Sequence, residues 1–251
     1  MRRLGSIGRL PWIRCSPSLK GRRQVRLESC VVGKLAASIL SADFAHLADQ
    51  VKLVEAHADV IHVDVMDAHF VPPLTVGPVV VESLRPVTGL PLHCHLMIER
   101  PERLFDDFSA AGTDMVTCHV EALGDPAPVV RKARDMGMRA GLAVNPDTPV
   151  ETVFPHLDDL DDVIVMSVRP GWAGQAFIPE VLPKIELVRR EIDRRGLSTD
   201  VEVDGGIDPG TGARCIGAGA TILAAASSIF KARDPVEAAR TLAAVARQGG
   251  A

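Results

Sequence analysis

Short apolar runs rich in β-branched residues recur along the chain from Leu35 onward, and each is followed by a stretch with helical spacing. The starts of successive runs are 21 to 37 residues apart, which is the length of one strand plus one helix. The eight runs are residues 35–40, 60–66, 90–98, 115–120, 139–145, 163–168, 200–204 and 221–226. This pattern predicts eight strands that alternate with helices.

The stretches between the runs place hydrophobic residues on one face of a helix. In the first of them Asp43 is the expected N-cap, and the residues that share the face are Phe44, Leu47, Val51 and Val54. Eight strands, each followed by a helix, is the count of a TIM barrel, whereas an open doubly wound sheet has about five or six strands. We therefore expect an α/β fold, a single TIM (β/α)8 barrel.

Length and composition agree with one barrel domain. The chain has 251 residues and a mass of 26.8 kDa, the usual size of a (β/α)8 barrel. Hydrophobic residues make up 47% and charged residues 24% of the chain, which excludes a disordered, collagen-like or disulfide-scaffold protein. No apolar run approaches the roughly 18 residues of a membrane span, so no membrane partner is expected.

Charge is distributed unevenly along the chain. The first 34 residues hold nine Lys or Arg against one acid, which leaves 19 basic and 31 acidic residues for the remainder. We expect residues 1–33 to be a basic N-terminal extension, disordered or not translated, ahead of a barrel domain at residues 34–251. A cytoplasmic location is expected, with an organellar one as the alternative because the extension resembles a transit peptide in composition. The acidic remainder is unsuited to nucleic acid, since binding phosphates requires a basic face.

Polar residues gather near the ends of the predicted strands, where the chemistry of a TIM barrel is located. His62, Asp64 and Met66 are spaced two residues apart, which places all three on one face of the second strand, and residues 93, 95 and 97 repeat that spacing on the third. If His62, Asp64, His95 and Asp204 all point inward, two imidazoles and two carboxylates meet. That ligand set suits one divalent ion: Zn, Fe(II), Mn or Co.

Structural roles are the alternatives for these residues taken singly: a hydrogen-bonded core histidine, or Asp204 as a helix N-cap. Two carboxylates on opposite sides of a flat intermediate also suit proton transfer, because one removes a proton from one face and the other returns it to the other face. Such chemistry inverts a carbon centre beside a carbonyl. A metal ion supplies the electrophile that stabilises the enediolate.

Five longer strings make the interpretation specific: AASILSADF (36–44), IHVDVMDAHFVP (61–72), HLMIERP (95–101), PGWAGQAFIPEVLPKI (170–185) and VEVDGGI (201–207). In this order they resemble the ribulose-phosphate 3-epimerase family from about residue 34 to the end. The resemblance implies a metal-dependent isomerase of the pentose phosphate pathway that interconverts D-ribulose 5-phosphate and D-xylulose 5-phosphate through a 2,3-enediolate. It also implies a phosphorylated ketose as substrate and a homo-oligomer.

The resemblance assigns roles to individual residues. It implies His62, Asp64, His95 and Asp204 as metal ligands, with Asp64 and Asp204 as the catalytic acid and base. Ser38 and His95 are implied as substrate contacts, and an apolar cap near the reacting carbon is implied for Met66, Met97 and Met166. Methionine is also a common core filler, so packing alone is the alternative for these three.

Three turns after the sixth, seventh and eighth runs are candidates for binding the substrate phosphate, because glycines let backbone N–H groups approach an anion. The candidate residues are Gly171, Trp172, Ala173, Gly174, Gly205, Gly206, Ala226 and Ser227. The chain departs from the family pattern with Ala at 68, 173 and 226 instead of Gly, Pro73 instead of Asn, and Ala37 instead of Pro. At Ala226 we expect either crowding of a phosphate oxygen by the Cβ or a φ that alanine disfavours, and hence weaker phosphate binding.

Two other functions compete with this one. A related 3-epimerase acts on a six-carbon ketose phosphate, allulose 6-phosphate, and some of those enzymes carry a small residue at the position of Ala173. A catalytically idle, phosphate-binding barrel with a scaffold role is the alternative from another class. The presence of both aspartates and both histidines argues against an idle barrel, because buried polar clusters are costly.

Overall fold

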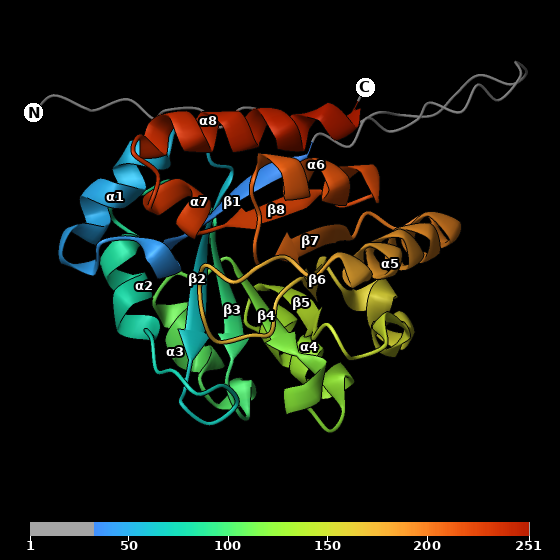
Figure 1. Ribbon diagram of the computed structural model, residues 1–251. Helices are drawn as coiled ribbons and strands as arrows, with labels where there is room; N and C mark the ends of the chain where they lie inside the picture. The colour runs from blue at the N-terminus through green and yellow to red at the C-terminus, as the bar shows by residue number, and fades with distance from the viewer. Residues whose placement is uncertain (1–32, 251) are drawn as a thin grey trace, which may run out of the picture.

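The computed structural model describes residues 33–250, and its eight parallel strands close into a barrel in sequence order, with β8 paired to β1 (Figure 1). The strands are β1 (Lys34–Ser38), β2 (Val60–Met66), β3 (Leu92–Met97), β4 (Met115–His119), β5 (Arg139–Val144), β6 (Asp162–Met166), β7 (Asp200–Asp204) and β8 (Ile222–Ala225). Four strands begin at the predicted residue and the other four within two residues of it. The predicted TIM barrel is confirmed.

Helices surround the strands (Figure 1). The α-helices are α1 (Leu47–Val54), α2 (Pro78–Leu84), α3 (Phe105–Ala110), α4 (Pro126–Asp135), α5 (Leu182–Arg195), α6 (Pro209–Gly217), α7 (Ser227–Phe230) and α8 (Pro235–Ala246). The 3₁₀ helices are η1 (Ile39–Ser41), η2 (Phe44–His46), η3 (Pro101–Arg103), η4 (Val120–Ala122), η5 (Val150–Asp159), η6 (Pro179–Val181) and η7 (Arg247–Gly250).

Two helical segments differ from the expected pattern. The connection after β5 is the 3₁₀ helix η5, which contains Pro155, and a proline inside an α-helix removes a hydrogen bond and clashes with the preceding turn. Asp43 caps the 3₁₀ helix η2 rather than α1 directly. Val51 and Val54 are buried as predicted, but Phe44 is 46% exposed, because η2 turns with a different period from the α-helix that follows.

The strands alternate between two environments, which is why polar residues reach the inside of the barrel. On β2, Ile61, Val63 and Val65 belong to the large apolar core between strands and helices. The intervening His62 and Asp64 face the inside, although both are buried. The interior also holds a small apolar cluster, whose packed residues are Ala36, Val60, Ile222 and Ala224.

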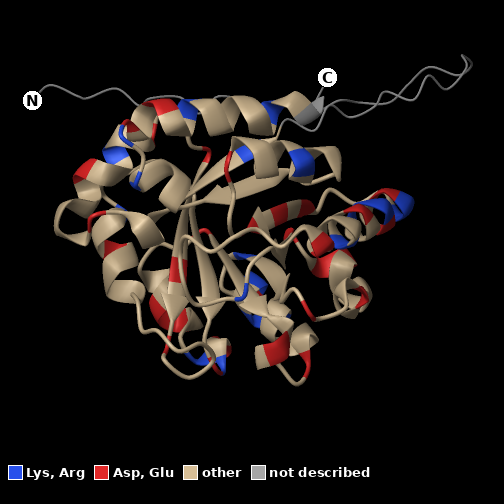
Figure 2. Ribbon diagram, in the orientation of Figure 1, with Lys and Arg blue, Asp and Glu red and all other residues tan. Residues whose placement is uncertain are grey.

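Acidic and basic side chains are interspersed on the outer helices (Figure 2). On α5, for example, Arg195 pairs with Glu191 at 2.7 Å and Arg189 with Asp193 at 2.8 Å. Such surface pairs each contribute about 0–1 kcal/mol, so burial of apolar residues dominates the stability of the barrel. Among residues 33–250, none of the helices combines the length and the apolar character that a membrane crossing requires.

Candidate functional site

The four side chains predicted as metal ligands lie together inside the barrel. Nδ1 of His95 is 3.3 Å from Oδ1 of Asp64 and 3.3 Å from Oδ2 of Asp204. Nε2 of His62 is 3.3 Å from the same Oδ1 of Asp64 and 3.8 Å from Oδ2 of Asp204. One ligand atom from each residue lies within 4.8 Å of the others, so this His₂Asp₂ group could hold a metal ion.

The histidines and Asp64 of the His₂Asp₂ group shift one another's pKa values. Burial raises the pKa of Asp64, but His62 and His95 lower it by more, and the pKa of this carboxyl is well below its usual range. Burial lowers the pKa of His62 and His95, yet the neighbouring carboxylates raise both pKa values above the ordinary value. Asp64 is therefore a carboxylate that requires positive charge beside it, which either imidazolium or a cation supplies.

The donor set fits a divalent cation. His62 is fully buried, and neither of its ring nitrogens makes a hydrogen bond of good geometry among the residues that the structure describes. An unsatisfied buried nitrogen is costly unless a ligand such as a metal ion meets it. Two imidazole nitrogens and two carboxylate oxygens are ligands that Zn, Fe(II), Mn and Co accept.

Glu202 is a buried acid that sequence reasoning did not single out. Its Oε1 is 2.8 Å from Nδ1 of His62, and its Oε2 is 3.2 Å from Nδ1 of His93. These three residues form a second cluster of possible metal ligands that shares His62 with the His₂Asp₂ group. The signal was present in the sequence, because Glu202 lies two residues before Asp204 and so on the same face of β7.

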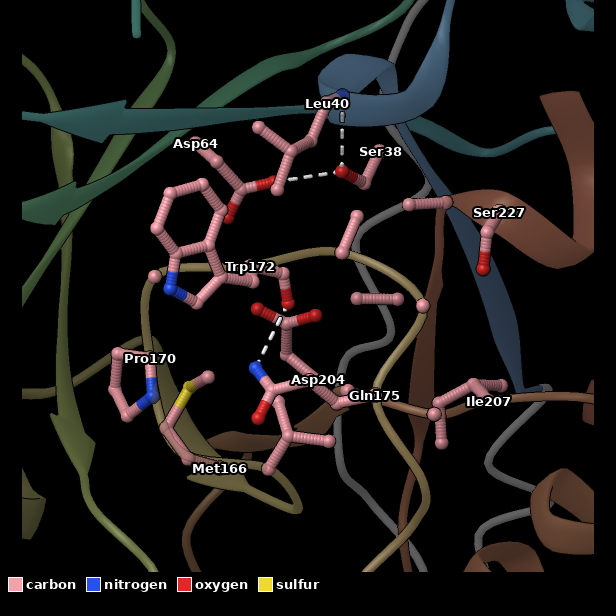
Figure 3. A pocket seen from close by; sticks show the side chains of 18 of the residues that line it. Ser38, Leu40, Asp64, Met166, Pro170, Trp172, Gln175, Asp204, Ile207 and Ser227 are labelled. Carbon is pink, nitrogen blue, oxygen red and sulfur yellow. Dashed lines mark hydrogen bonds between the residues drawn. The ribbon is translucent and has the colours of Figure 1, made fainter. Parts of the chain in front are cut away.

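A cavity opens above the His₂Asp₂ group at the C-terminal end of the strands. Asp64 enters it from β2 and Asp204 from β7, and Trp172 and Gln175 lie across its mouth (Figure 3). The predicted substrate contacts that line it are Ser38, Met66, Met97, Met166, Gly171, Trp172, Ala173, Gly174, Gly205, Gly206, Ala226 and Ser227. The structure thus brings together residues from strands that are far apart in the sequence and from the turns after them.

Some predicted and observed positions differ. His95 does not line the cavity, and it lies fully buried behind the two aspartates. The lining residues that sequence reasoning did not select are Leu40, Val168, Pro170, Gln175, Ile207 and Ala224. Most of these are apolar and carry no chemical signal. Gln175 was recognisable, since it lies in the glycine-containing turn after β6.

The three candidate phosphate turns converge on this cavity. Gly206 has φ +62°, and a Cβ there would lie 2.7 Å from the backbone nitrogen of Phe177, so only glycine fits this close approach. The side chain of Gln175 donates hydrogen bonds to the carbonyls of Arg169 and Trp172 at 2.7 and 2.8 Å. These bonds hold the turn over the cavity mouth.

The structure decides three expectations about backbone conformation and helix capping. Ala226 has φ −111°, so the expectation of a φ that alanine disfavours is wrong, and crowding by its Cβ remains the prediction. Ala68 instead has φ +60°, in the region that favours glycine. The N-cap of α6 is Asp208, which accepts from the N–H groups of Gly210 and Thr211, and this rules out a capping role for Asp204.

Comparison with known proteins gives close relatives over most of the chain. The sequence profile described as "Ribulose-phosphate 3 epimerase family" matches residues 34–230. The "Ribulose-phosphate 3-epimerase" of Mycobacterium tuberculosis is 48% identical over 217 residues, which cover 86% of this chain and 93% of that protein. The one from Bacillus subtilis is 48% identical over 191 residues, covering 75% and 88%, respectively. The "Ribulose-5-phosphate-3-epimerase, chloroplastic" of Arabidopsis thaliana is 45% identical over 216 residues, covering 85% and 77%.

Solved structures agree on the fold. KGPDC from Streptococcus mutans superposes with a TM-score of 0.68 at 20% identity, covering 86% of this chain and 98% of that one. The 3-hexulose-6-phosphate synthase of Salmonella typhimurium gives a TM-score of 0.65 at 18% identity, covering 86% and 99%. At these identities the likeness concerns the barrel alone.

Proposed function

The chain belongs to the ribulose-phosphate 3-epimerase family and is an isomerase, and from this premise we propose how its residues interconvert D-ribulose 5-phosphate and D-xylulose 5-phosphate. One observation carries the mechanism. Asp64 and Asp204 come from strands far apart in the sequence, yet both lie 3.3 Å from one nitrogen of His95 and both face the same cavity. A planar intermediate in that cavity has a carboxylate available to each face.

Proton transfer at C3 is assigned to these two carboxylates. One aspartate removes the C3 proton, which lies beside the substrate carbonyl and is therefore acidic, and the other returns a proton to the opposite face. The roles exchange when the reaction runs in reverse. The hydrogen bond from Ser38 to Asp64 holds that carboxylate in place, and the side chains of Met66, Met97 and Met166 keep water away from the reacting carbon.

A divalent ion, Zn, Fe(II), Mn or Co, is the cofactor that His62, Asp64, His95 and Asp204 would hold. When bound, it supplies Lewis-acid stabilisation of the negative charge that develops on the substrate oxygens. The protein residues supply the remainder of the site: they bind and orient the sugar, exclude water and carry the proton.

The phosphate group of the substrate is assigned to the three turns at the far side of the cavity. Backbone N–H groups near Gly174, Gly206 and Ser227 would donate to its oxygens, since glycine-containing turns at this end of a barrel suit anions. A phosphate held there places the sugar across the cavity toward Asp64 and Asp204. Assembly as a homo-oligomer is part of the same proposal.

Residues 34–251 are proposed as the epimerase domain and residues 1–33 as an extension outside it. Residues 1–32 lie outside the described residues, so their predicted character stays a prediction. The cytoplasmic location, with an organellar one as its alternative, depends on the same segment. Deleting residues 1–33 is expected to leave turnover and melting temperature almost unchanged, and a large loss of either would contradict the boundary.

The mechanism is tested with Asp64→Asn and Asp204→Asn. Each change removes one of the two proton carriers that epimerisation requires, so each variant is expected to lose turnover by several orders of magnitude, while circular dichroism reports a folded barrel. Asp49→Asn on the exposed face of α1 is the matched control and is expected to behave as the unmodified protein. Near-normal turnover in either site variant would overturn the two-carboxylate mechanism.

Substrate choice is tested by comparing ribulose 5-phosphate with allulose 6-phosphate as substrates of the same preparation. A preference for the pentulose phosphate is expected. A higher kcat/KM for allulose 6-phosphate would show that the six-carbon sugar is the preferred substrate. The roles proposed for the two aspartates would stay the same.

A further inference from the structure

A line of three side chains leads away from the His₂Asp₂ group without entering the cavity. Nε2 of His95 lies 2.9 Å from Nε2 of His119, which ends β4, and the two rings are stacked with centroids 5.0 Å apart. Nδ1 of His119 lies 3.1 Å from Oε2 of Glu121 on η4. His119 is fully buried, and neither His119 nor Glu121 lines the cavity. The line therefore has no direct contact with a substrate bound there.

These contacts allow one arrangement of protons when His95 binds a cation. A ring nitrogen that offers its lone pair carries no proton, and Nδ1 of His95 is the nitrogen that faces Asp64 and Asp204. Nε2 of His95 then carries the proton and donates to Nε2 of His119. His119 in turn carries its proton on Nδ1 and donates to the carboxylate of Glu121.

Glu121 is held as a carboxylate at the end of this line. Its Oε1 accepts from the backbone N–H of Asn145 at 2.8 Å and from the hydroxyl of Thr148. Burial raises the pKa of Glu121, but the hydrogen bonds from His119, Thr148 and Asn145 lower it by more, to about 2. Both oxygens of Glu121 therefore act as acceptors, and the one that faces His119 requires a proton on Nδ1.

We propose that Glu121 is a positioning residue that acts through His119 to hold His95 in the form whose Nδ1 lone pair faces the two aspartates. Partners of this kind fix the orientation and proton position of metal-binding histidines, and their loss weakens metal binding by about 10- to 100-fold. The proposal rests on the proposed metal site. It adds a determinant of cation affinity that lies outside the four ligands and outside the cavity.

Glu121→Gln is the direct test. A glutamine amide turned toward His119 donates to Nδ1 and favours the opposite proton arrangement, whereas the reverse orientation places its NH₂ against the donors of Asn145 and Thr148. Zn²⁺ titrated into the metal-free protein against a chromogenic chelator is expected to bind about 10- to 100-fold more weakly to this variant. Glu151→Gln, an exposed acid at the start of η5, is the matched control and is expected to leave Zn²⁺ affinity unchanged.

A double-mutant comparison separates positioning from general loss of structure. In His119→Gln, the side-chain carbonyl replaces the Nε2 acceptor and receives the His95 proton without help from Glu121. In that background Glu121→Gln is expected to change Zn²⁺ affinity by less than about threefold, because without His119 no hydrogen bonds connect Glu121 to His95. An equal loss of affinity in both backgrounds would overturn the proposal, as would unchanged affinity of the single variant Glu121→Gln.

A readout that needs no metal keeps this proposal separable from the metal site. Nitrogen chemical shifts of ¹⁵N-labelled histidine in the metal-free protein are expected to report His119 with its proton on Nδ1 and none on Nε2, and to report loss of that form in Glu121→Gln. If the unmodified protein binds no Zn²⁺, the proposed metal site is wrong, and these chemical shifts still test the role of Glu121. If Glu121→Gln does not fold, His119→Gln and His119→Ala take its place. The first is expected to bind Zn²⁺ more tightly than the second, because only glutamine offers an acceptor to Nε2 of His95, and equal Zn²⁺ affinity in the two variants overturns the proposal.

Discussion

The hydroxyl group of Ser38 donates a 2.6 Å hydrogen bond to Oδ2 of Asp64, while the other oxygen of Asp64 lies 3.3 Å from His62 and His95 (Figure 3). The same Ser38 oxygen accepts from the N–H of Leu40 at 3.3 Å, which caps the short helix η1 after β1. Ser38 therefore ties the orientation of a proposed catalytic carboxylate to the backbone at the barrel mouth. Both roles depend on one hydroxyl group.

Ser38→Ala is expected to reduce kcat by about 10- to 100-fold, because a hydrogen bond to a charged group contributes roughly 1.5–3 kcal/mol and Asp64 loses this partner. Steady-state turnover of ribulose 5-phosphate measures the effect. Ser83→Ala, at an exposed site on α2, is the control and is expected to be neutral. Unchanged kcat in Ser38→Ala would show that Asp64 needs no support from β1.

A second prediction concerns the turn after β8, where Ala226 lines the cavity. If its Cβ crowds a phosphate oxygen, Ala226→Gly lowers the KM for ribulose 5-phosphate by about 3- to 10-fold and leaves kcat unchanged, since the interaction is uniform along the reaction. Competitive inhibition by inorganic phosphate is expected to tighten in parallel. The same KM in both proteins would mean that the turn accommodates the methyl group.

The barrel and the clustering of the His₂Asp₂ group could be predicted because the sequence of each strand shows which residues share a face. In β2 the alternation of apolar residues with His62 and Asp64 is visible in seven consecutive letters, and the same holds for Asp204 in β7. Alternation places these residues on one face of their strands, and a closed barrel whose other face packs against helices leaves the interior for that face. Their clustering then follows from topology, because the C-terminal ends of all strands meet at one mouth.

The parts that could not be predicted depend on contacts between side chains on different strands. The stacked pair His95 and His119 results from the register of β3 against β4 and the tilt of both strands, neither of which the sequence states. Phe44 was assigned to a buried face because a 3₁₀ turn and an α-helix have the same hydrophobic letters. The positive φ of Ala68 was not predicted either, although the family pattern has Gly at this position and glycine favours such a φ.

Ala68 gives a third prediction, which concerns stability. Its φ of +60° costs about 1–2 kcal/mol for a residue with a Cβ, and glycine removes this cost. Glycine also raises the entropy of the unfolded chain, which lowers the free energy of unfolding by about 0.4–1 kcal/mol. Ala68→Gly is therefore expected to raise the free energy of unfolding by up to about 1 kcal/mol in urea denaturation. Ala244→Gly, at an exposed position inside α8, is expected to lower it by about 1 kcal/mol, as glycine does within a helix. If both substitutions changed the free energy of unfolding in the same direction, the positive φ of residue 68 would not be the cause of the difference.

Asp162, the first residue of β6, gives a prediction with a defined pH dependence. Its side chain is fully buried, Oδ2 lies 3.4 Å from the hydroxyl of Thr117, and Oδ1 has no hydrogen-bond partner among the described residues. Burial, together with the charges of Glu202 and Asp200, raises the pKa of Asp162 well above its ordinary value. An acid whose pKa is raised on folding contributes stability below its unfolded pKa, near 4, and loses that contribution as pH rises toward the folded pKa.

Asp162→Asn keeps the shape of this side chain, keeps an acceptor for the hydroxyl of Thr117 and removes the ionisation. The variant is therefore expected to match the unmodified protein near pH 4 and to be more stable by roughly 1–3 kcal/mol at pH 8, because burying an unpaired polar charge has at least that cost. Denaturant unfolding at the two pH values measures the difference, with Glu82→Gln on the exposed face of α2 as the control that is expected to show none. A variant that is less stable at pH 8, or a difference that does not grow between pH 4 and pH 8, would show that Asp162 is ionised and satisfied inside the barrel.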